Sequence, residues 1–257
     1  MAPMAAFRVG VHLRPQHTSV DAMRAAWREA DAMGVDSITI WDHFFPLSGD
    51  ADGTHFECWS LLAAMAVETR RAQIGAIVSA IAYRNPDLLA DMARTVDHLS
   101  DGRLILGVGA GNSERDHAEY GFEYGTPGER LKVLWSGLER IKARLERLNP
   151  PPKGQLPILI GGGGEQVTLR LVAKYADMSN TPGSPDVVRH KNQVIDDWCT
   201  RLGRNPAEIE RTTNVPVSAV DGIEAYVEAG AQRLQIQLDH PFGLAPVEKA
   251  LKRRDSA

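Results

Sequence analysis

The sequence has little of what marks disulfide-stabilised, metal-binding, membrane-spanning or nucleic-acid-binding proteins. Its 257 residues include only two cysteines, Cys58 and Cys199, far apart and outside any spacing typical of zinc sites. No apolar run approaches the roughly 20 residues that cross a bilayer, and Arg8 interrupts the N-terminal apolar stretch, which lacks a cleavage site. The net charge of -4 does not favour nucleic acid or an anionic membrane as a partner. We therefore expect no metal, no disulfide framework and a cytoplasmic location.

Apolar, β-branched segments alternate with amphipathic helical segments along the chain. The expected strands are FRVGVHL (7–13), VDSITIWD (35–42), AQIGAIVS (72–79), RLILGVG (103–109), LPILIGG (156–162), ADMSN (176–180), IERTTNV (209–215) and RLQIQL (233–238). Helices are expected over 18–34, 57–70, 85–99, 127–148, 166–175, 185–202, 223–229 and from about 245 onward. The first helix opens with Thr18 and Asp21 at capping-box spacing, and the third with Asn85 as its N-cap before Pro86.

Eight such strand-helix pairs predict an α/β fold, a (β/α)8 TIM barrel in a single domain over residues 1–257. The length is usual for this barrel. An open doubly wound sheet is the alternative, because periodicity alone does not show closure. The one linker-like segment, NPPPKGQ (149–155), is too short to separate domains. In a barrel, the chemistry is expected at the carboxyl ends of the strands.

The second strand ends in an acid and an imidazole, within ITIWDHFFP (38–46). His43 could give or take a proton near neutral pH, since the ordinary pKa of histidine lies close to it. Asp42 could orient the site or bond to a ligand. The alternative is structural: Asp42 begins a turn, and His43 is a hydrogen-bonded interface residue.

Two glycine-rich segments end the fourth and fifth strands. The run 161–164 stands between a strand and a helix, where close backbone approach and free N–H groups suit a phosphate; a tight turn without a ligand is the alternative. Gly107, Gly109 and Gly111, followed by Asn112, would leave room for a flat ring at the barrel mouth. Neither segment is a Walker loop or a complete dinucleotide fingerprint.

Three further polar features stand near strand ends. Ser79 could hydrogen-bond a ligand, whereas Tyr83 and Arg84 are expected to have structural roles. The run of acids and one histidine over 114–119 is expected to be a solvated loop rather than a metal site.

Three segments, in this order and spacing, resemble the bacterial luciferase-like superfamily, and most closely its branch that uses the deazaflavin coenzyme F420. They are GVDSITIWDHF, YRNPDLLADMARTVDHLSDGRLILGVGAG and LPILIGGGGEQVTLRLVAKYADMSN. The resemblance implies a (β/α)8 barrel that binds a flavin or deazaflavin at its carboxyl-terminal mouth, and a homodimer.

The resemblance also implies roles for individual residues. His43 matches the histidine proposed as proton acceptor in the sugar-phosphate dehydrogenase branch, and Asp42 stands beside it near the reactive ring. Ala76 and Ile77 match a pair joined by a non-prolyl cis peptide behind the ring, and Ser79 matches a hydroxyl that contacts the cofactor.

Two glycine-bearing segments complete the implied cofactor site, and two positions depart from the pattern. Gly109, Gly111 and Asn112 match the segment beside the ring; Gly162, Gly163 and Gly164 match the phosphate site. The sugar-phosphate dehydrogenase branch has a glutamate at the position of Asn112 and a tryptophan at that of Leu47, and its substrate-phosphate cations lack clear counterparts. A sugar phosphate is therefore not the expected substrate.

The function expected from this resemblance is hydride transfer between F420 and a small organic substrate, namely an alcohol, a ketone or an activated alkene. His43 would transfer the proton, with Asp42 and Asn112 as hydrogen-bonding partners. One alternative is an FMN-dependent luciferase-like monooxygenase, and another is a deazaflavin-binding barrel without turnover. A phosphate-binding lyase or isomerase is disfavoured, because no lysine stands at a strand end. Neither nucleic acid nor a membrane is an expected partner.

Overall fold

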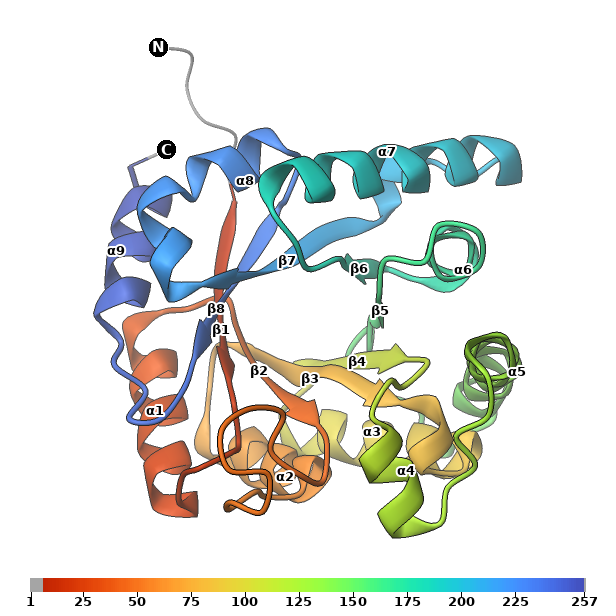
Figure 1. Ribbon diagram of the computed structural model, residues 1–257, viewed down its shortest axis with the longest axis horizontal. Helices are drawn as coiled ribbons and strands as arrows, with labels where there is room; N and C mark the ends of the chain where they lie inside the picture. Colours follow the sequence, from red (N-terminus) through yellow and green to blue (C-terminus); the bar gives the residue numbers. More distant parts are fainter. Residues whose placement is uncertain (1–6, 257) are drawn as a thin grey trace.

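Each apolar, β-branched segment forms a strand, and the eight strands pair in sequence order into a closed parallel barrel (Figure 1). The computed structural model describes residues 7–256. The strands are β1 (Arg8–Leu13), β2 (Ser37–Asp42), β3 (Gln73–Ala80), β4 (Leu104–Gly109), β5 (Ile158–Gly161), β6 (Met178–Asn180), β7 (Glu210–Pro216) and β8 (Arg233–Leu238). Because β1 pairs with β8 along its whole length, the barrel is closed, and the open-sheet alternative is wrong.

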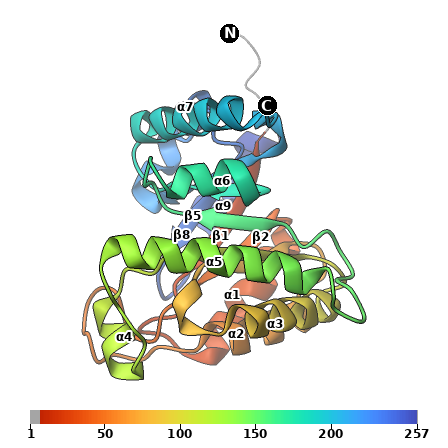
Figure 2. The same cartoon turned by 90° about the vertical axis from the view of Figure 1, so that its right-hand side faces the viewer.

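Helices follow the strands and cover the outside of the barrel. They are α1 (Val20–Met33), α2 (Cys58–Glu68), α3 (Pro86–Leu99), α4 (Glu114–Tyr120), α5 (Pro127–Leu145), α6 (Thr168–Tyr175), α7 (Pro185–Leu202), α8 (Glu224–Glu228) and α9 (Ala245–Arg254). Short 3-10 turns are η1 (Ile81–Tyr83), η2 (Pro206–Glu208) and η3 (Val217–Gly222). Figure 2 shows α7, α6, α5 and α3 stacked down one side.

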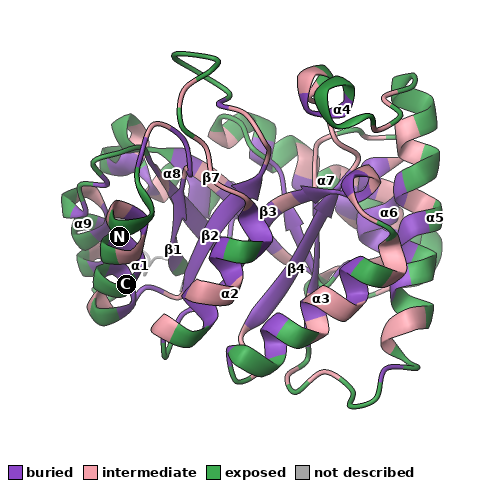
Figure 3. Cartoon of the chain, turned by 90° about the horizontal axis from the view of Figure 1, so that it is seen from below, coloured by how far each residue is buried: buried purple, intermediate pink, exposed green. Residues whose placement is uncertain are grey.

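The side chains of each strand alternate between two cores. One face packs against the helices and forms the large apolar cluster, as Ile38 and Ile40 of β2 do. The other face points into the barrel, where a small second cluster holds Ile77, Ile105, Leu159 and Met178. Figure 3 shows this division as buried strands inside helices whose outer faces are exposed.

Two local expectations from the sequence are wrong. The N-cap of α1 is Ser19, whose hydroxyl accepts from the N–H of Ala22, so Thr18 does not cap the helix. The segment 114–119 is not a solvated loop. It lies within α4, a short helix capped by Ser113 and ended by Gly121 in the left-handed region, and two of its side chains are buried.

Strand β3 shifts its register in the middle. Its pairing with β2 jumps between Ile40 and Asp42, and its pairing with β4 jumps between Gly75 and Ser79. The non-prolyl cis peptide lies within this irregular stretch, but it joins Ile77 to Val78. The expected bond between Ala76 and Ile77 is therefore wrong by one residue.

Of the expectations about the chain ends, two fall partly outside the described residues. The N-terminal apolar stretch before Phe7 is one, and the outer limits of the domain over 1–257 are the other. Within residues 7–256, every helix is too short or too polar to cross a membrane. The same residues contain no cluster of three or more His, Cys, Asp or Glu side chains that could hold a metal ion.

Candidate functional site

A cavity of about 560 Å³ opens at the carboxyl ends of the strands. This volume is in the usual range for small-molecule sites. Strand ends and the loops after them supply its lining: His12, Arg14, Trp41, Asp42, His43, Leu47, Ser48, Ile77, Val78, Ala80, Gly109, Ala110, Gly111, Asn112, Gly161, Gly162, Thr168, Asn180, Pro182, Asn214 and Gln237. Aromatic, amide and glycine surfaces thus surround one space at the end of the barrel where this fold places its active sites.

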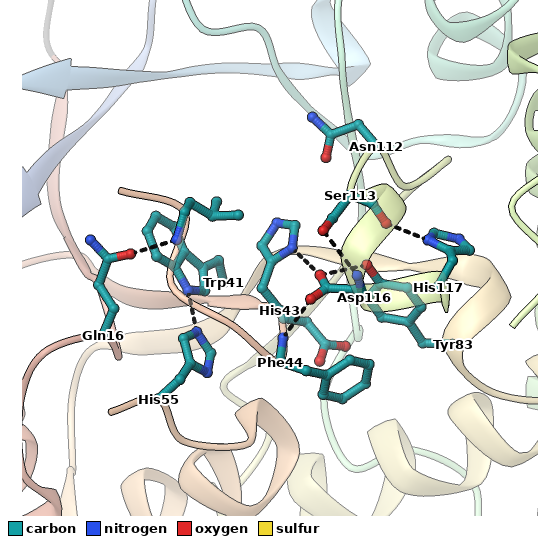
Figure 4. Close-up of polar contacts among 12 residues, drawn as sticks. Gln16, Trp41, His43, Phe44, His55, Tyr83, Asn112, Ser113, Asp116 and His117 are labelled. Atoms are coloured by element: carbon teal, nitrogen blue, oxygen red, sulfur yellow. Dashed lines mark hydrogen bonds and ion pairs between the residues drawn. The ribbon is translucent and has the colours of Figure 1, made fainter. Parts of the chain in front are cut away.

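His43 reaches the cavity because of strand alternation. In β2, Ile38 and Ile40 face the helices, so Trp41 and His43 fall on the inner side. The Nδ1 atom of His43 lies 2.6 Å from Oδ2 of Asp116 (Figure 4). A carboxylate only accepts, so Nδ1 carries a proton, and Nε2 is the ring nitrogen that can take up or release the second one.

Asp116 is the functional residue that the sequence reasoning missed. Its side chain is fully buried on α4, and it accepts hydrogen bonds from His43, from the Tyr83 hydroxyl at 2.8 Å and from the N–H of Phe44 at 3.3 Å. Burial raises the pKa of Asp116, but these donors outweigh burial and leave it below its ordinary value. The helix signals, Ser113 as N-cap and Gly121 at the C-terminus, were present in the sequence.

Asp42 does not orient His43, which corrects the expected pairing. Its carboxylate is fully buried on the outer face of β2 and forms two bonds with Arg84, at 2.5 and 3.2 Å. Arg84 also pairs with Glu57 at 2.6 Å, which confirms its structural role. Burial raises the pKa of Asp42, and the Arg84 guanidinium opposes that shift. The pair therefore ties η1 to the end of β2 rather than presenting a charge to the cavity.

Two histidines beside Trp41 are held neutral by burial. Burial lowers the pKa of His12 to about 3 and that of His55 to about 4. The indole N–H of Trp41 donates to Nε2 of His55 at 2.9 Å. The Nδ1 atom of His12 lies 3.0 Å from the Thr39 hydroxyl, which itself donates to a carbonyl. His12 thus donates from Nδ1 and keeps Nε2 as an acceptor.

Ser79 does not reach the cavity, contrary to its implied role in cofactor contact. The register shift in β3 turns Val78 and Ala80 inward and Ser79 outward. The Ser79 hydroxyl accepts from the indole N–H of Trp59 on α2 at 3.0 Å. Of the expected cis pair, Ile77 lines the cavity and Ala76 packs in the outer core.

Glycines of β4 and β5 make room for β3 as well as for a ligand. A Cβ atom at Gly109 would lie 2.6 Å from a methyl group of Val78, and one at Gly161 would lie 2.7 Å from the other methyl group. At Gly107 it would meet the carbonyl oxygen of Ala76 at 1.9 Å. Larger residues at these positions would therefore clash with the inward bulge of β3.

The glycine run after β5 offers two free donors. The N–H of Gly162 is already bonded to the Asn180 carbonyl at 3.0 Å, so it is not available to an anion. Gly163 and Gly164 donate to no group among the described residues. The Thr168 side chain lies close to Gly164, and its hydroxyl would be 3.0 Å from a Cβ atom there. The N–H groups of Gly163 and Gly164, with the Thr168 hydroxyl beside them, form a ledge next to the cavity that suits a phosphate. We call it the phosphate ledge.

A cation stands beside this ledge. The Cε atom of Lys191 on α7 would lie 3.5 Å from a Cβ atom at Gly163. Its ammonium pairs with Glu165 at 2.6 Å. Lys191 thus neutralises the charge of Glu165, the one acid within the loop, so that this carboxylate does not repel an anion bound at the ledge.

Asn112 and Leu47 stand at the rim. Asn112 is exposed and lines the cavity, and its side chain forms no hydrogen bond with His43 (Figure 4). Leu47 is half exposed, and its N–H donates to Gln16 at 2.9 Å. Both therefore face the space that a ligand would enter, as does Gly111 at the end of β4.

Comparison with known proteins agrees with this geometry. The family described as luciferase-like monooxygenase matches residues 2–254. An F420-dependent glucose-6-phosphate dehydrogenase of Amycolatopsis mediterranei is 32% identical over 166 residues, which cover 57% of this chain and 47% of the relative. The chain thus spans about half the length of this relative, and 62% of the next one.

Two solved structures share the fold. An F420-dependent secondary alcohol dehydrogenase in complex with an F420-acetone adduct superposes with a TM-score of 0.85 at 16% identity, covering 97% of this chain and 99% of that one. The oxygenating constituent of 3,6-diketocamphane monooxygenase of Pseudomonas putida, in complex with FMN, gives 0.78 at 15% identity and covers 96% of each chain. The match over residues 2–254 shows that the chain belongs to the luciferase-like monooxygenase family, and the closed barrel agrees with it.

Proposed function

We propose that this protein is an oxidoreductase that moves a hydride between coenzyme F420 and a small organic substrate, either an alcohol, a ketone or an activated alkene. The observation that carries the proposal is the pairing of His43 with buried Asp116 at the edge of a cavity, whose lining reaches Gly162, next to the unpaired N–H groups of Gly163 and Gly164. The names of the F420-dependent relative and of the alcohol dehydrogenase of similar fold support the choice of cofactor.

The cavity fits a deazaflavin in two respects. A flat ring needs an opening lined by aromatic, amide and glycine surfaces, which Trp41, Asn214 and Gly109 provide. The phosphate of its tail needs unpaired donors, which the N–H groups of Gly163 and Gly164 provide. When bound, F420 supplies two-electron hydride chemistry.

The residues of the chain then have distinct roles. His43 exchanges the substrate hydroxyl proton through Nε2, and Asp116 keeps Nδ1 protonated and fixes the ring. Neutral His12 on the adjacent strand β1 offers Nε2 as a second acceptor. Asp42 acts only as part of the scaffold, through Arg84. Asn112, which lines the rim of the cavity, would bond with a ligand there.

An FMN-dependent monooxygenase is the second candidate. The FMN-bound structure with the same fold supports it, since a phosphate ledge serves either cofactor. The purified protein should quench F420 fluorescence on binding and bind FMN more weakly. Tight binding of FMN, without binding of F420, would replace the first candidate by the second.

A deazaflavin-binding barrel without turnover is the third candidate. His43→Ala should leave the dissociation constant of F420 nearly unchanged and abolish substrate reduction by reduced F420. If the wild-type protein binds F420 but reduces none of a panel of ketones, enones and nitroaromatics, the carrier function is preferred. A homodimer is a further part of the proposal, and light scattering on the purified protein tests it.

A further inference from the structure

Arg14 stands in the cavity wall without a role in the chemistry described above. It follows β1, lines the cavity, and holds its guanidinium carbon 5.5 Å from the centroid of the Trp41 ring. Its Nη1 atom contacts both oxygens of Asp239, at 3.0 and 3.3 Å. Its Nε atom is buried and has no hydrogen-bond partner within residues 7–256. The Arg14 guanidinium borders the space for a ligand and keeps a donor that Asp239 does not use, although Nε itself is covered by protein atoms.

Arg14 is the only lysine or arginine among the cavity residues of the described chain. The single carboxylate among them, Asp42, is turned away and held by Arg84. The partner of Arg14, Asp239, has a side chain that is 56% exposed, so water already competes for this pair. A carboxylate inside the cavity would meet a positive charge that no buried group neutralises.

The barrel order separates Arg14 from the phosphate ledge. Arg14 follows β1 and the glycine run follows β5, and these strands lie opposite each other in a ring of eight. The adjacent strand is β2, which carries Trp41 and His43. The ring centroids of these two residues are 5.9 Å apart. Arg14 and His43 thus flank Trp41, on the side of the cavity away from the cofactor phosphate.

The amide side chains and His12 that also line the cavity are uncharged. Asn180, Asn214 and Gln237 are amides, and burial holds the pKa of His12 at about 3, so it is neutral. Such groups can bond a hydroxyl or a carbonyl, but they do not select for charge. The charge selection of the cavity therefore depends on Arg14.

We propose that Arg14 binds the carboxylate of the substrate, and that the substrate is a small hydroxy acid or keto acid. This inference rests on the proposed function and specifies its substrate class. In the oxidation direction, the carbinol carbon loses a hydride to oxidised F420, and the hydroxyl proton passes to Nε2 of His43, giving the keto acid. The acid group does not react, and its ion pair with Arg14 orients the reacting carbon toward His43.

The test measures the binding of keto acids under conditions in which they are not reduced, because F420 is either absent or oxidised. Pyruvate, 4-oxopentanoate and 5-oxohexanoate place the carboxylate at increasing distances from the carbonyl, and their methyl esters are neutral counterparts. Each is titrated into the protein by calorimetry, with and without oxidised F420. We expect at least one acid to bind roughly tenfold more tightly than its ester, since a charge-assisted hydrogen bond is worth this much.

Three variants connect this preference to Arg14. Arg14→Met should remove the preference for the acid and leave ester binding unchanged, and Arg14→Lys should retain part of it. Asp239→Asn should tighten acid binding, because it removes the competing carboxylate. Arg189→Met is the control, since it removes the same charge from an exposed site on α7 that pairs with Asp186.

Several results would overturn the proposal. One is that no acid binds more tightly than its ester. Another is that Arg14→Met weakens the binding of acids and esters alike. A third is that Arg14→Met weakens F420 itself, which would assign Arg14 to the cofactor. If F420 fails to bind, the proposed function fails, but the titrations without cofactor still decide the role of Arg14.

Discussion

Replacing Asp116 by asparagine removes one negative charge from beneath His43 and preserves the shape of the side chain. The carboxylate now accepts from three donors, with Nδ1 of His43 at 2.6 Å. A hydrogen bond to a charged partner contributes about 1.5–3 kcal/mol. Since about 1.4 kcal/mol corresponds to a factor of ten, kcat should fall roughly tenfold to a hundredfold. KM should change little, because Asp116 does not line the cavity.

The same substitution also affects stability. An asparagine amide would turn an NH2 group toward at least one of the three donors, and an unsatisfied buried group costs about 1–3 kcal/mol. Asp97→Asn is the matched control. Asp97 is also buried, and it accepts from the N–H groups of Lys153 and Gly154, away from the cavity. The Asp97→Asn variant should lose a similar free energy of unfolding in urea and keep the wild-type kcat.

The assay is steady-state reduction of a ketone panel by reduced F420, together with proton NMR. The Nδ1 proton of His43 in so short a bond should resonate far downfield in the wild type, and this signal should disappear in Asp116→Asn. Wild-type kcat in Asp116→Asn, or an equal loss of kcat in Asp97→Asn, would refute the positioning role.

Three further predictions concern the scaffold and the ledge. Arg84→Met should lower the free energy of unfolding by about 3–5 kcal/mol, because it leaves Asp42 buried without its partner; the double variant with Asp42→Asn should recover part of this loss, as chemical denaturation would show. Between pH 7 and pH 5, His12 should lower the stability of the wild-type protein by about 2 kcal/mol, because its pKa is about 3 in the folded protein and about 6.5 when unfolded, so the unfolded chain binds more protons over this range. His55, with a folded pKa of about 4, should add to this loss in the same direction. His12→Gln should remove the His12 share of this dependence in urea titrations at each pH, and an unchanged slope would exclude His12 as a source. Lys191→Met should weaken F420 up to roughly fivefold in fluorescence titrations and leave the phosphate-free deazaflavin unaffected; equal weakening of both ligands would contradict the ledge.

The periodicity of the sequence determined the eight strands, their alternation with helices and most element boundaries, whereas closure is shown by the pairing of β1 with β8. Strand β7, which has the weakest apolar pattern of the eight, still forms, because its pairing with β6 and β8 closes the barrel. Helix α7 begins at Pro185 and ends at Leu202 as its pattern predicts. Such features are local, since turn chemistry and side-chain alternation act within a few residues. The position of His43 at a strand end follows from the same local rules.

Only the tertiary structure decided which side chains meet at the mouth. His43 and Asp116 are 73 residues apart, and no spacing in the sequence could pair them. Asp42, adjacent to His43, faces the opposite side of β2, and the register shift in β3 turned Ser79 away from the cavity. These outcomes depend on strand pairing and on packing between distant segments, because one residue of register exchanges the inner and outer faces of a strand.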